Sequence, residues 1–258
     1  YPIKQIEEMT KGNRKIGLGV MGFADMLILL RIPYNSEEAL KTARELMKFI
    51  TEEARKTSVE LGKEKGSFPN FKGSRWDELG YEAMRNATVT TIAPTGSISE
   101  IAGCSQGIEP LFAIGYIRNV AESLGTNLIV VNPYFERIAI EEGFYDEKIL
   151  KEVLSSTSIQ HIKEIPERIR RIFVTAHDIS PEWHVRIQAA FQEFVDNGIS
   201  KTINFPHDAT PHDVEKAFML AYDLGCLGVT VYRQGSRQQE VLKPIGEGIS
   251  VCEVCELS

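Results

Sequence analysis

Two stretches of this 258-residue sequence carry residue types that could do chemistry, and the first is PTGSISE at residues 94–100. Pro94 and Gly96 interrupt an extended run, and Ser97 and Glu100 have the Ser-x-x-Glu spacing of a capping box. A helix is therefore expected to begin near Ile98. Its first amides, together with those of the preceding loop, would form a concave array of donors suited to a phosphate group. The candidate phosphate-binding residues are Pro94, Thr95, Gly96, Ser97, Ile98 and Ser99.

The same spacing also fits an ordinary connection between a strand and a helix, in which the serines only cap. Capping boxes are common, and most of them hold no ligand. Residue spacing alone therefore leaves both interpretations of this loop open.

The second stretch is Cys252-Glu-Val-Cys255, three residues from the end of the sequence. Two thiols at this spacing can close a disulfide in a turn, or they can supply half of a tetrahedral zinc site. Zinc would need two more ligands, and Cys104 and Cys226 are expected to be buried thiols of the folded body. We therefore favour a redox pair, although the neighbouring acidic side chains should raise the thiol pKa values and lower reactivity. The expected division is a folded domain at residues 1–243 and a flexible tail at residues 244–258.

Two other patterns are interpreted as structural. Residues 17–22, GLGVMG, match the dinucleotide fingerprint GxGxxG, but a polar, basic stretch precedes them and no acidic residue follows at the required distance. We expect a glycine-rich helix surface that allows close packing. The five histidines show neither HxH nor HExxH spacing, so we expect no metal site and place most of them at helix caps or on the surface.

Composition limits the class of protein. A net charge of −7 without a basic stripe argues against a nucleic-acid surface. No apolar run is long enough to span a bilayer, and the first residues do not resemble a secretory signal, so we expect a cytoplasmic protein with no membrane contact.

The elements that must position the loop alternate between strands and helices. Residues 88–92 are β-branched and predict a buried central strand, with a second strand expected over residues 112–120. Asn35 with Glu38 should cap a long amphipathic helix that ends near Gly62. Further helices are expected at residues 133–143, 146–155, 166–173 and 181–198, and a parallel strand–helix–strand unit at residues 199–232. The fold class is therefore α/β.

The loop and the following GCSQGIEPLFA resemble the phosphate-binding loop of the large catalytic subunit of ribonucleotide reductases, in the adenosylcobalamin-dependent class II form. The resemblance continues in GNRKIGLGVMGFADML (12–27), FVTAHDISPEWHVRIQAAFQ (173–192), SKTINFP (200–206) and LGCLGVTVYRQGSR (224–237). It implies the C-terminal half of a ten-stranded α/β barrel. It also implies reduction of ribonucleoside di- or triphosphates by a thiyl radical, with electrons from Cys252 and Cys255.

In that family the radical cysteine lies in an Asn-x-Cys-x-Glu motif, and none of the four cysteines here has those flanks. The chain, which also lacks an initial Met, is expected to be a C-terminal portion that is inactive alone. Part of a barrel would expose a strand edge and an apolar face, so a missing segment should cover them. The implied partners are the upstream portion of the reductase, a ribonucleotide substrate, a thioredoxin-like reductant and, as one option, a second copy in a homodimer.

Tyr232 stands where class I relatives carry the first of two adjacent tyrosines that relay a radical between subunits, but Arg233 follows it here. This departure favours a radical made by adenosylcobalamin, with Tyr232 shaping the pocket near the reacting thiol. Two alternatives remain: a fragment of a metal-radical class I large subunit, and a non-catalytic phosphate-binding or assembly module.

Overall fold

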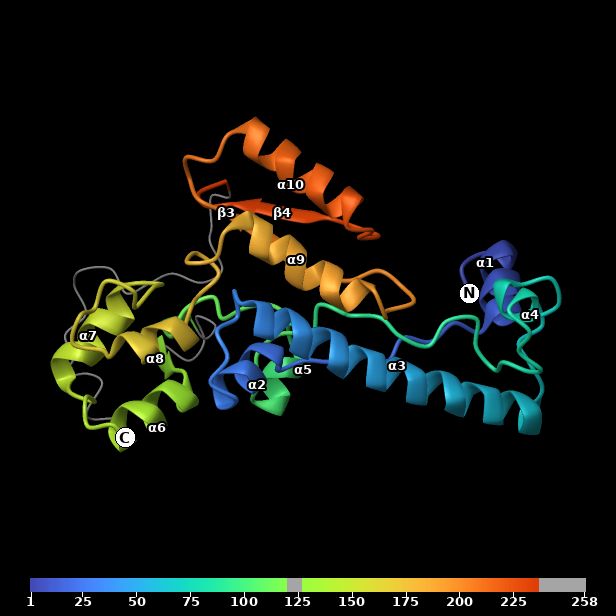
Figure 1. Cartoon of the computed structure of the whole chain (residues 1–258), viewed down its shortest axis with the longest axis horizontal. Helices are drawn as coiled ribbons and strands as arrows, with labels where there is room; N and C mark the ends of the chain where they lie inside the picture. Colours follow the sequence, from blue (N-terminus) through green and yellow to red (C-terminus); the bar gives the residue numbers. More distant parts are fainter. Residues whose placement is uncertain (120–126, 237–258) are drawn as a thin grey trace.

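The computed structural model describes residues 1–119 and 127–236, so the proposed tail with Cys252 and Cys255 lies outside the described residues. It has the expected mixture of helices and strands (Figure 1). The strands are β1 (Gly115–Asn119), β2 (Asn127–Val131), β3 (Thr202–Phe205) and β4 (Thr230–Arg233). The helices are α1 (Lys4–Asn13), α2 (Phe23–Leu29), α3 (Glu37–Lys65), α4 (Arg75–Glu78), α5 (Ile98–Ala102), α6 (Pro133–Glu141), α7 (Glu147–Ser155), α8 (Glu167–Ile172), α9 (Pro181–Gln192) and α10 (Pro211–Asp223).

Parallel pairings run through the middle of the molecule. Leu18 bridges Thr90, Ile92 bridges Ile199, and β3 pairs with β4 in the register Thr202 to Thr230. Backbone hydrogen bonds extend the first two contacts, including those from the amide of Leu18 to Val89 and from the amide of Ser200 to Ile92. The β-branched run at residues 88–92 is thus central, as its composition predicts, although its ladder consists of isolated bridges rather than a long strand.

Helix α9 packs against α3, α10 and β3. Figure 1 shows α9 next to the pair of strands β3 and β4, with α3 on its other side. The ion pairs Arg44–Glu193 and Arg186–Glu37 join α3 to the α9 region at the surface. Helices α6, α7 and α8 gather at one end of α3, and α1 and α4 gather at the other.

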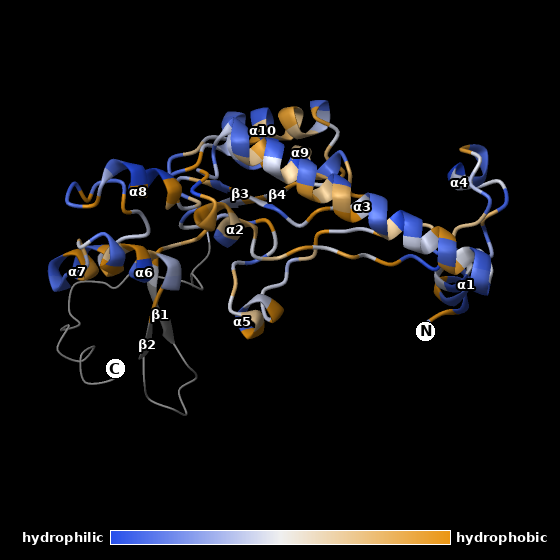
Figure 2. Ribbon diagram, turned by 60° about the horizontal axis from the view of Figure 1, so that its bottom comes forward, coloured by the Kyte–Doolittle hydropathy of each residue, from blue (hydrophilic) through white to orange (hydrophobic). Residues whose placement is uncertain are grey.

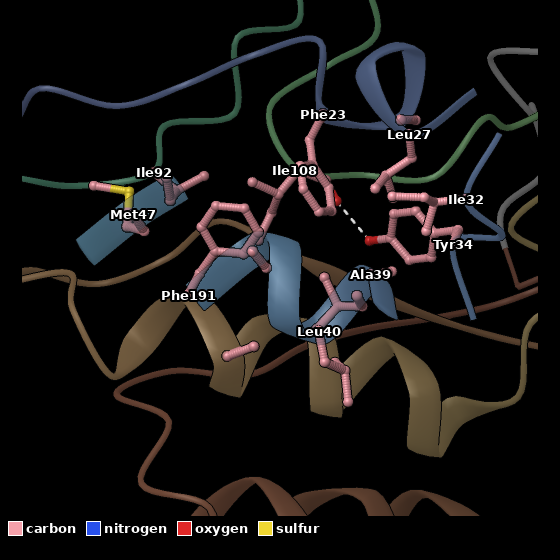
Figure 3. Close-up of a cluster of buried hydrophobic side chains, with 14 of the residues drawn as sticks. Phe23, Leu27, Ile32, Tyr34, Ala39, Leu40, Met47, Ile92, Ile108 and Phe191 are labelled. Carbon is pink, nitrogen blue, oxygen red and sulfur yellow. Dashed lines mark hydrogen bonds between the residues drawn. The ribbon is translucent and has the colours of Figure 1, made fainter. Parts of the chain in front are cut away.

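The main core lies where α2, α3 and α9 meet the central segments (Figure 3). Phe23 and Phe191 pack edge to face with ring centroids 4.9 Å apart, and Tyr34 completes the cluster against Phe23. The buried hydroxyl of Tyr34 donates to the carbonyl of Ile108 at 2.6 Å. This core therefore holds the chain that returns from the candidate phosphate loop.

Local signals place most of the helices correctly, but several caps and ends differ. The expected helices at residues 133–143, 146–155 and 166–173 are confirmed within a few residues by α6, α7 and α8. Ser36, not Asn35, caps α3, because its hydroxyl accepts from the amide of Ala39. Helix α3 also continues through Gly62 to Lys65, and α9 ends at Gln192 rather than at residue 198.

The prediction of a helix surface at residues 17–22 is wrong. This segment is extended, and a Cβ on Gly19 would lie 2.2 Å from the carbonyl oxygen of Thr91. Gly22 has φ +80° at the start of α2. The glycines do allow close packing, but against the neighbouring extended segment.

The second expected strand is present but shorter. Strand β1 begins at Gly115, three residues later than expected.

Candidate phosphate-binding site

The candidate loop lies at the surface between the central parallel segment and α5. Pro94, Gly96, Ser97 and Ile98 are exposed, and a Cβ placed on Gly96 would meet no atom within 4 Å. Figure 2 shows α5 on the opposite side of the central extended segments from α3. The backbone of the loop is therefore accessible to a ligand.

Three consecutive amides of the loop, those of Gly96, Ser97 and Ile98, donate to no acceptor within the described part of the chain. The amide of Ser99, by contrast, donates to the carbonyl of Thr95 at 3.0 Å, and the Ser99 side chain is buried. Of the five candidate amides at residues 95–99, only that of Ser99 is thus committed to an acceptor among the described residues, and three of the other four belong to exposed residues. Because α5 has only five residues, these local amides matter more than the helix dipole.

The expected capping box is wrong. Ser97 has helical backbone angles (φ −89°, ψ −41°), and its hydroxyl makes no capping hydrogen bond. A capping serine needs an extended backbone to aim its oxygen at the helix, and Ser97 does not have one. The helix nevertheless begins at Ile98, as expected.

Thr95 fixes the shape of the loop. Its φ of +53° lies in the left-handed region, which a β-branched residue seldom adopts. Its hydroxyl accepts from the amide of Gly107 at 2.8 Å, on the chain that returns from α5. A contact across twelve residues therefore offsets the cost of an unfavourable backbone conformation.

Asp25 anchors the start of the chain that returns from α5. We call residues 103–111 the return segment. The Asp25 carboxylate accepts from the amide of Ser105 at 2.6 Å, and the Ser105 hydroxyl accepts from the amide of Asp25. Burial raises the pKa of the Asp25 carboxyl, while the hydrogen bonds with Ser105 lower it. The neighbouring thiol of Cys104 has a raised pKa, because of burial and the proximity of Asp25.

A buried polar cluster, which we call the Lys201 cluster, lies where the return segment meets β3. It consists of Lys201, Glu109 and His184, and sequence analysis did not detect it. Lys201 Nζ lies 2.7 Å from Glu109 Oε2 and 2.8 Å from His184 Nδ1, and it also donates to the carbonyl of Thr202. The three donors of an ammonium group are thus matched by three acceptors.

His184 is neutral in this cluster. An ammonium can only donate, so Nδ1 accepts, and the ring proton lies on Nε2, which is 3.2 Å from the carbonyl of Ala176. Burial lowers the pKa of His184 to about 2, and the charge of Lys201 acts in the same direction. Burial also lowers the pKa of Lys201, and Glu109 opposes that effect. His184 is thus a buried core residue rather than the cap or surface residue expected for most of the histidines.

Tyr232 lies on β4 and pairs in register with Asn204 of β3. It is half-buried, and Arg233 occupies the next position of the same strand. The Lys201 cluster adjoins Thr202, two residues before Asn204, so it connects the return segment of the loop to the strand pair that carries Tyr232.

Cys104 and Cys226 are free thiols in half-buried positions. Burial raises the pKa of Cys226 to about 11, so it is largely protonated at neutral pH. Within residues 1–119 and 127–236, no group of three potential ligands could hold a metal ion. In the same residues, no helix combines the length and apolar character that a bilayer crossing requires.

A groove of about 420 Å³ runs between α3 and the segment around Leu18. Apolar side chains such as Phe49 and Val89 form most of its lining, and Ile16 and Leu18 remain more than half exposed. An apolar groove beside a segment whose other edge has no strand partner among the described residues matches the expectation that the chain is part of a larger structure.

The family follows from the comparison with known proteins. The family model described as "Ribonucleotide reductase, barrel domain" matches residues 1–82 and 77–232, which cover most of the chain. The chain belongs to this family, and the resemblance based on the loop and its flanking motifs is confirmed.

The most similar curated relatives include two vitamin B12-dependent ribonucleoside-diphosphate reductases. The protein of Thermoplasma acidophilum is 50% identical over 94% of this chain and 31% of its own length. The protein of Mycobacterium tuberculosis is 44% identical over 94% of this chain and 34% of its own length. The chain thus spans about a third of the length of these relatives.

A solved structure gives the same fold. The class Id ribonucleotide reductase alpha subunit of Actinobacillus ureae superposes with a TM-score of 0.76 at 26% identity, covering 88% of this chain and 40% of that subunit. The expected α/β barrel fold is thereby confirmed at the level of the family.

Proposed function

We propose that this chain supplies the substrate-phosphate loop of an adenosylcobalamin-dependent ribonucleotide reductase. The observation that carries the proposal is the set of three exposed amides at Gly96, Ser97 and Ile98, which have no acceptor among residues 1–119 and 127–236. Backbone amides that converge at a turn bind phosphate oxygens without requiring a lysine. The loop belongs to a reductase barrel domain, so the phosphate is that of the ribonucleotide substrate.

The names of the relatives support two finer points. Both relatives described above are called vitamin B12-dependent and ribonucleoside-diphosphate reductases, which favours the cobalamin class and a diphosphate substrate. Arg233 beside Tyr232 supports the same class, because the pair of tyrosines that a class I relay uses is interrupted. The reaction would be reduction of the ribonucleotide to its 2′-deoxy form by a thiyl radical, in the cytosol.

The groove beside α3 is a poor fit for the corrinoid itself. The groove beside α3 is mostly apolar and offers few polar partners for the amide-rich edge of a corrinoid. We expect much of the cobalamin-binding surface and the radical cysteine to lie in the rest of the polypeptide. We expect the upstream coding sequence to contain an Asn-x-Cys-x-Glu motif.

The loop assignment is tested by nucleotide titration of the complete reductase. Gly96→Pro removes one of the three donors and constrains Thr95, so it should abolish binding. Gly96→Ala retains the amide and has open space for its methyl group, so it should retain most of the affinity. Wild-type affinity in Gly96→Pro, with an unchanged melting temperature, would overturn the assignment.

The tail thiols belong to the same proposal. Cys252 and Cys255 would carry electrons from a thioredoxin-like reductant to the active-site cysteines by thiol–disulfide exchange. In the complete enzyme, Cys252→Ser or Cys255→Ser should stop thioredoxin-driven turnover. A single turnover of prereduced enzyme and activity driven by dithiothreitol should survive. Stoichiometric zinc that is released by either substitution would assign the pair to a metal instead.

A further inference from the structure

The Lys201 cluster joins two parts of the chain that are far apart in sequence. Glu109 accepts from Lys201 through Oε2 and from the amide of Thr202 through Oε1, at 2.7 and 2.6 Å. Lys201 directly precedes β3, which begins at Thr202, whereas Glu109 lies ten residues after Ser99. Both carboxylate oxygens are thus used to hold the return segment against the first residues of β3.

The return segment in turn holds the phosphate loop. The amide of Gly107 donates to Thr95, the residue with the left-handed backbone. Next in the chain is Ile108, which is fully buried and whose carbonyl accepts from Tyr34 (Figure 3). Glu109 follows directly, so three successive residues of one segment fix Thr95, the core and β3.

His184 closes the cluster from the other side. Its Nδ1 accepts from Lys201, and its Nε2 donates to the carbonyl of Ala176. The amide of Ala176 donates to the carbonyl of Leu111, two residues after Glu109. Lys201 therefore acts on the return segment directly through Glu109 and indirectly through His184.

We propose that Lys201 and Glu109 are positioning residues for the substrate phosphate. They fix the loop amides of residues 96–98 relative to the β3–β4 pair, although neither side chain reaches the loop surface. This inference rests on the proposed function of the loop. A buried ion pair is a poor source of stability compared with apolar residues of equal volume, but it defines one alignment of the segments that it joins.

The structure offers a matched control. Asp196 accepts from the amide of Val89 at 2.7 Å and pairs with Arg55, so it also ties a buried carboxylate to the central segment. Val89 lies at the opposite end of that segment from Pro94 and the loop. Loss of the Asp196–Arg55 pair should destabilise the packing around the central segment without moving the loop.

The experiment measures KM for the ribonucleotide, kcat and the melting temperature in the complete reductase. Lys201→Met and Glu109→Gln should each raise KM at least tenfold, while kcat changes less than threefold. The KM of the double variant should be no higher than that of the single variant with the higher KM, because both substitutions break the same Lys201–Glu109 pair. Asp196→Asn should lower the melting temperature and leave KM within threefold.

Two outcomes would overturn the inference. One is an unchanged KM in Glu109→Gln, which keeps the shape of the side chain and tests the charge even if Lys201→Met fails to fold. The other is a KM that rises in proportion to the loss of melting temperature in all variants, including Asp196→Asn. That result would give the cluster a purely structural role. If Gly96→Pro also binds nucleotide normally, the proposed function of the loop fails first. If Gly96→Pro abolishes binding, only the role of the cluster is lost.

Discussion

The hydroxyl of Thr95 accepts a hydrogen bond from the amide of Gly107 at 2.8 Å, and this contact spans the whole excursion that contains α5. Gly107 has a positive φ of 46°, as Thr95 does at 53°. Two residues with left-handed backbones therefore face each other at the base of the candidate phosphate loop, and each of them limits the conformation of the other.

Thr95→Val should weaken both the fold and nucleotide binding. The valine keeps the branched shape but cannot accept, so the amide of Gly107 loses its partner at a cost of about 1–3 kcal/mol. Nucleotide titration and thermal unfolding of the complete enzyme measure the two effects. Thr91→Val is the control, because Thr91 donates to the carbonyl of Gly198 away from the loop. Equal loss of affinity in both variants would contradict a specific role for Thr95.

Ser36→Ala and Ser97→Ala should differ in stability, although sequence spacing predicts a cap at Ser97. The hydroxyl of Ser36 accepts from the amide of Ala39, so its loss should cost about 0.5–2 kcal/mol. Ser97 makes no capping bond, so its loss should cost less than about 0.5 kcal/mol. Unfolding midpoints measure the difference, and a larger loss in Ser97→Ala would contradict the geometry of the loop.

Gly19→Ala should be strongly destabilising, by about 1–3 kcal/mol or more. The added Cβ would lie 2.2 Å from the carbonyl oxygen of Thr91, and a backbone atom cannot rotate away as a side chain can. Gly198→Ala is the control, since its Cβ would meet nothing within 4 Å. A soluble Gly19→Ala protein with the melting temperature of the wild type would contradict the close approach of these segments.

Stability should depend on His184 at mildly acidic pH. Its pKa is about 2 in the folded chain and near 6.5 when unfolded, so only the unfolded state takes up the proton as the pH falls below 6.5. The contribution of neutral His184 to the free energy of unfolding is complete above pH 6.5. Below pH 6.5 it decreases by up to about 1.4 kcal/mol per pH unit. Between pH 6.5 and 5, wild type should therefore lose more stability than His184→Gln. Parallel unfolding midpoints for the two proteins over this range would show that His184 is not buried in the neutral form.

The sequence by itself determined the family and most of the helices. Proline at the first helical position, after Asn132, Ser180 and Thr210, marks the starts of α6, α9 and α10, because such signals act within one turn of the chain. The parallel pairing of β3 and β4 followed from the strand–helix–strand order. The candidate phosphate loop was proposed from a motif of neighbouring residues, and its helix begins where that motif predicts.

Tertiary structure decided how the loop is held. Ser97 is not a cap because its backbone angles are set by the left-handed turn at Thr95, which depends on Gly107. Residues 17–22 are extended because they pair with residues 88–91, some seventy positions away. Lys201 and Glu109 are separated by 92 residues, and each looks like an ordinary surface charge in the sequence. Only the folded chain removes the ammonium of Lys201 from water and partly covers Glu109, and the desolvation of Lys201 makes a charged partner necessary.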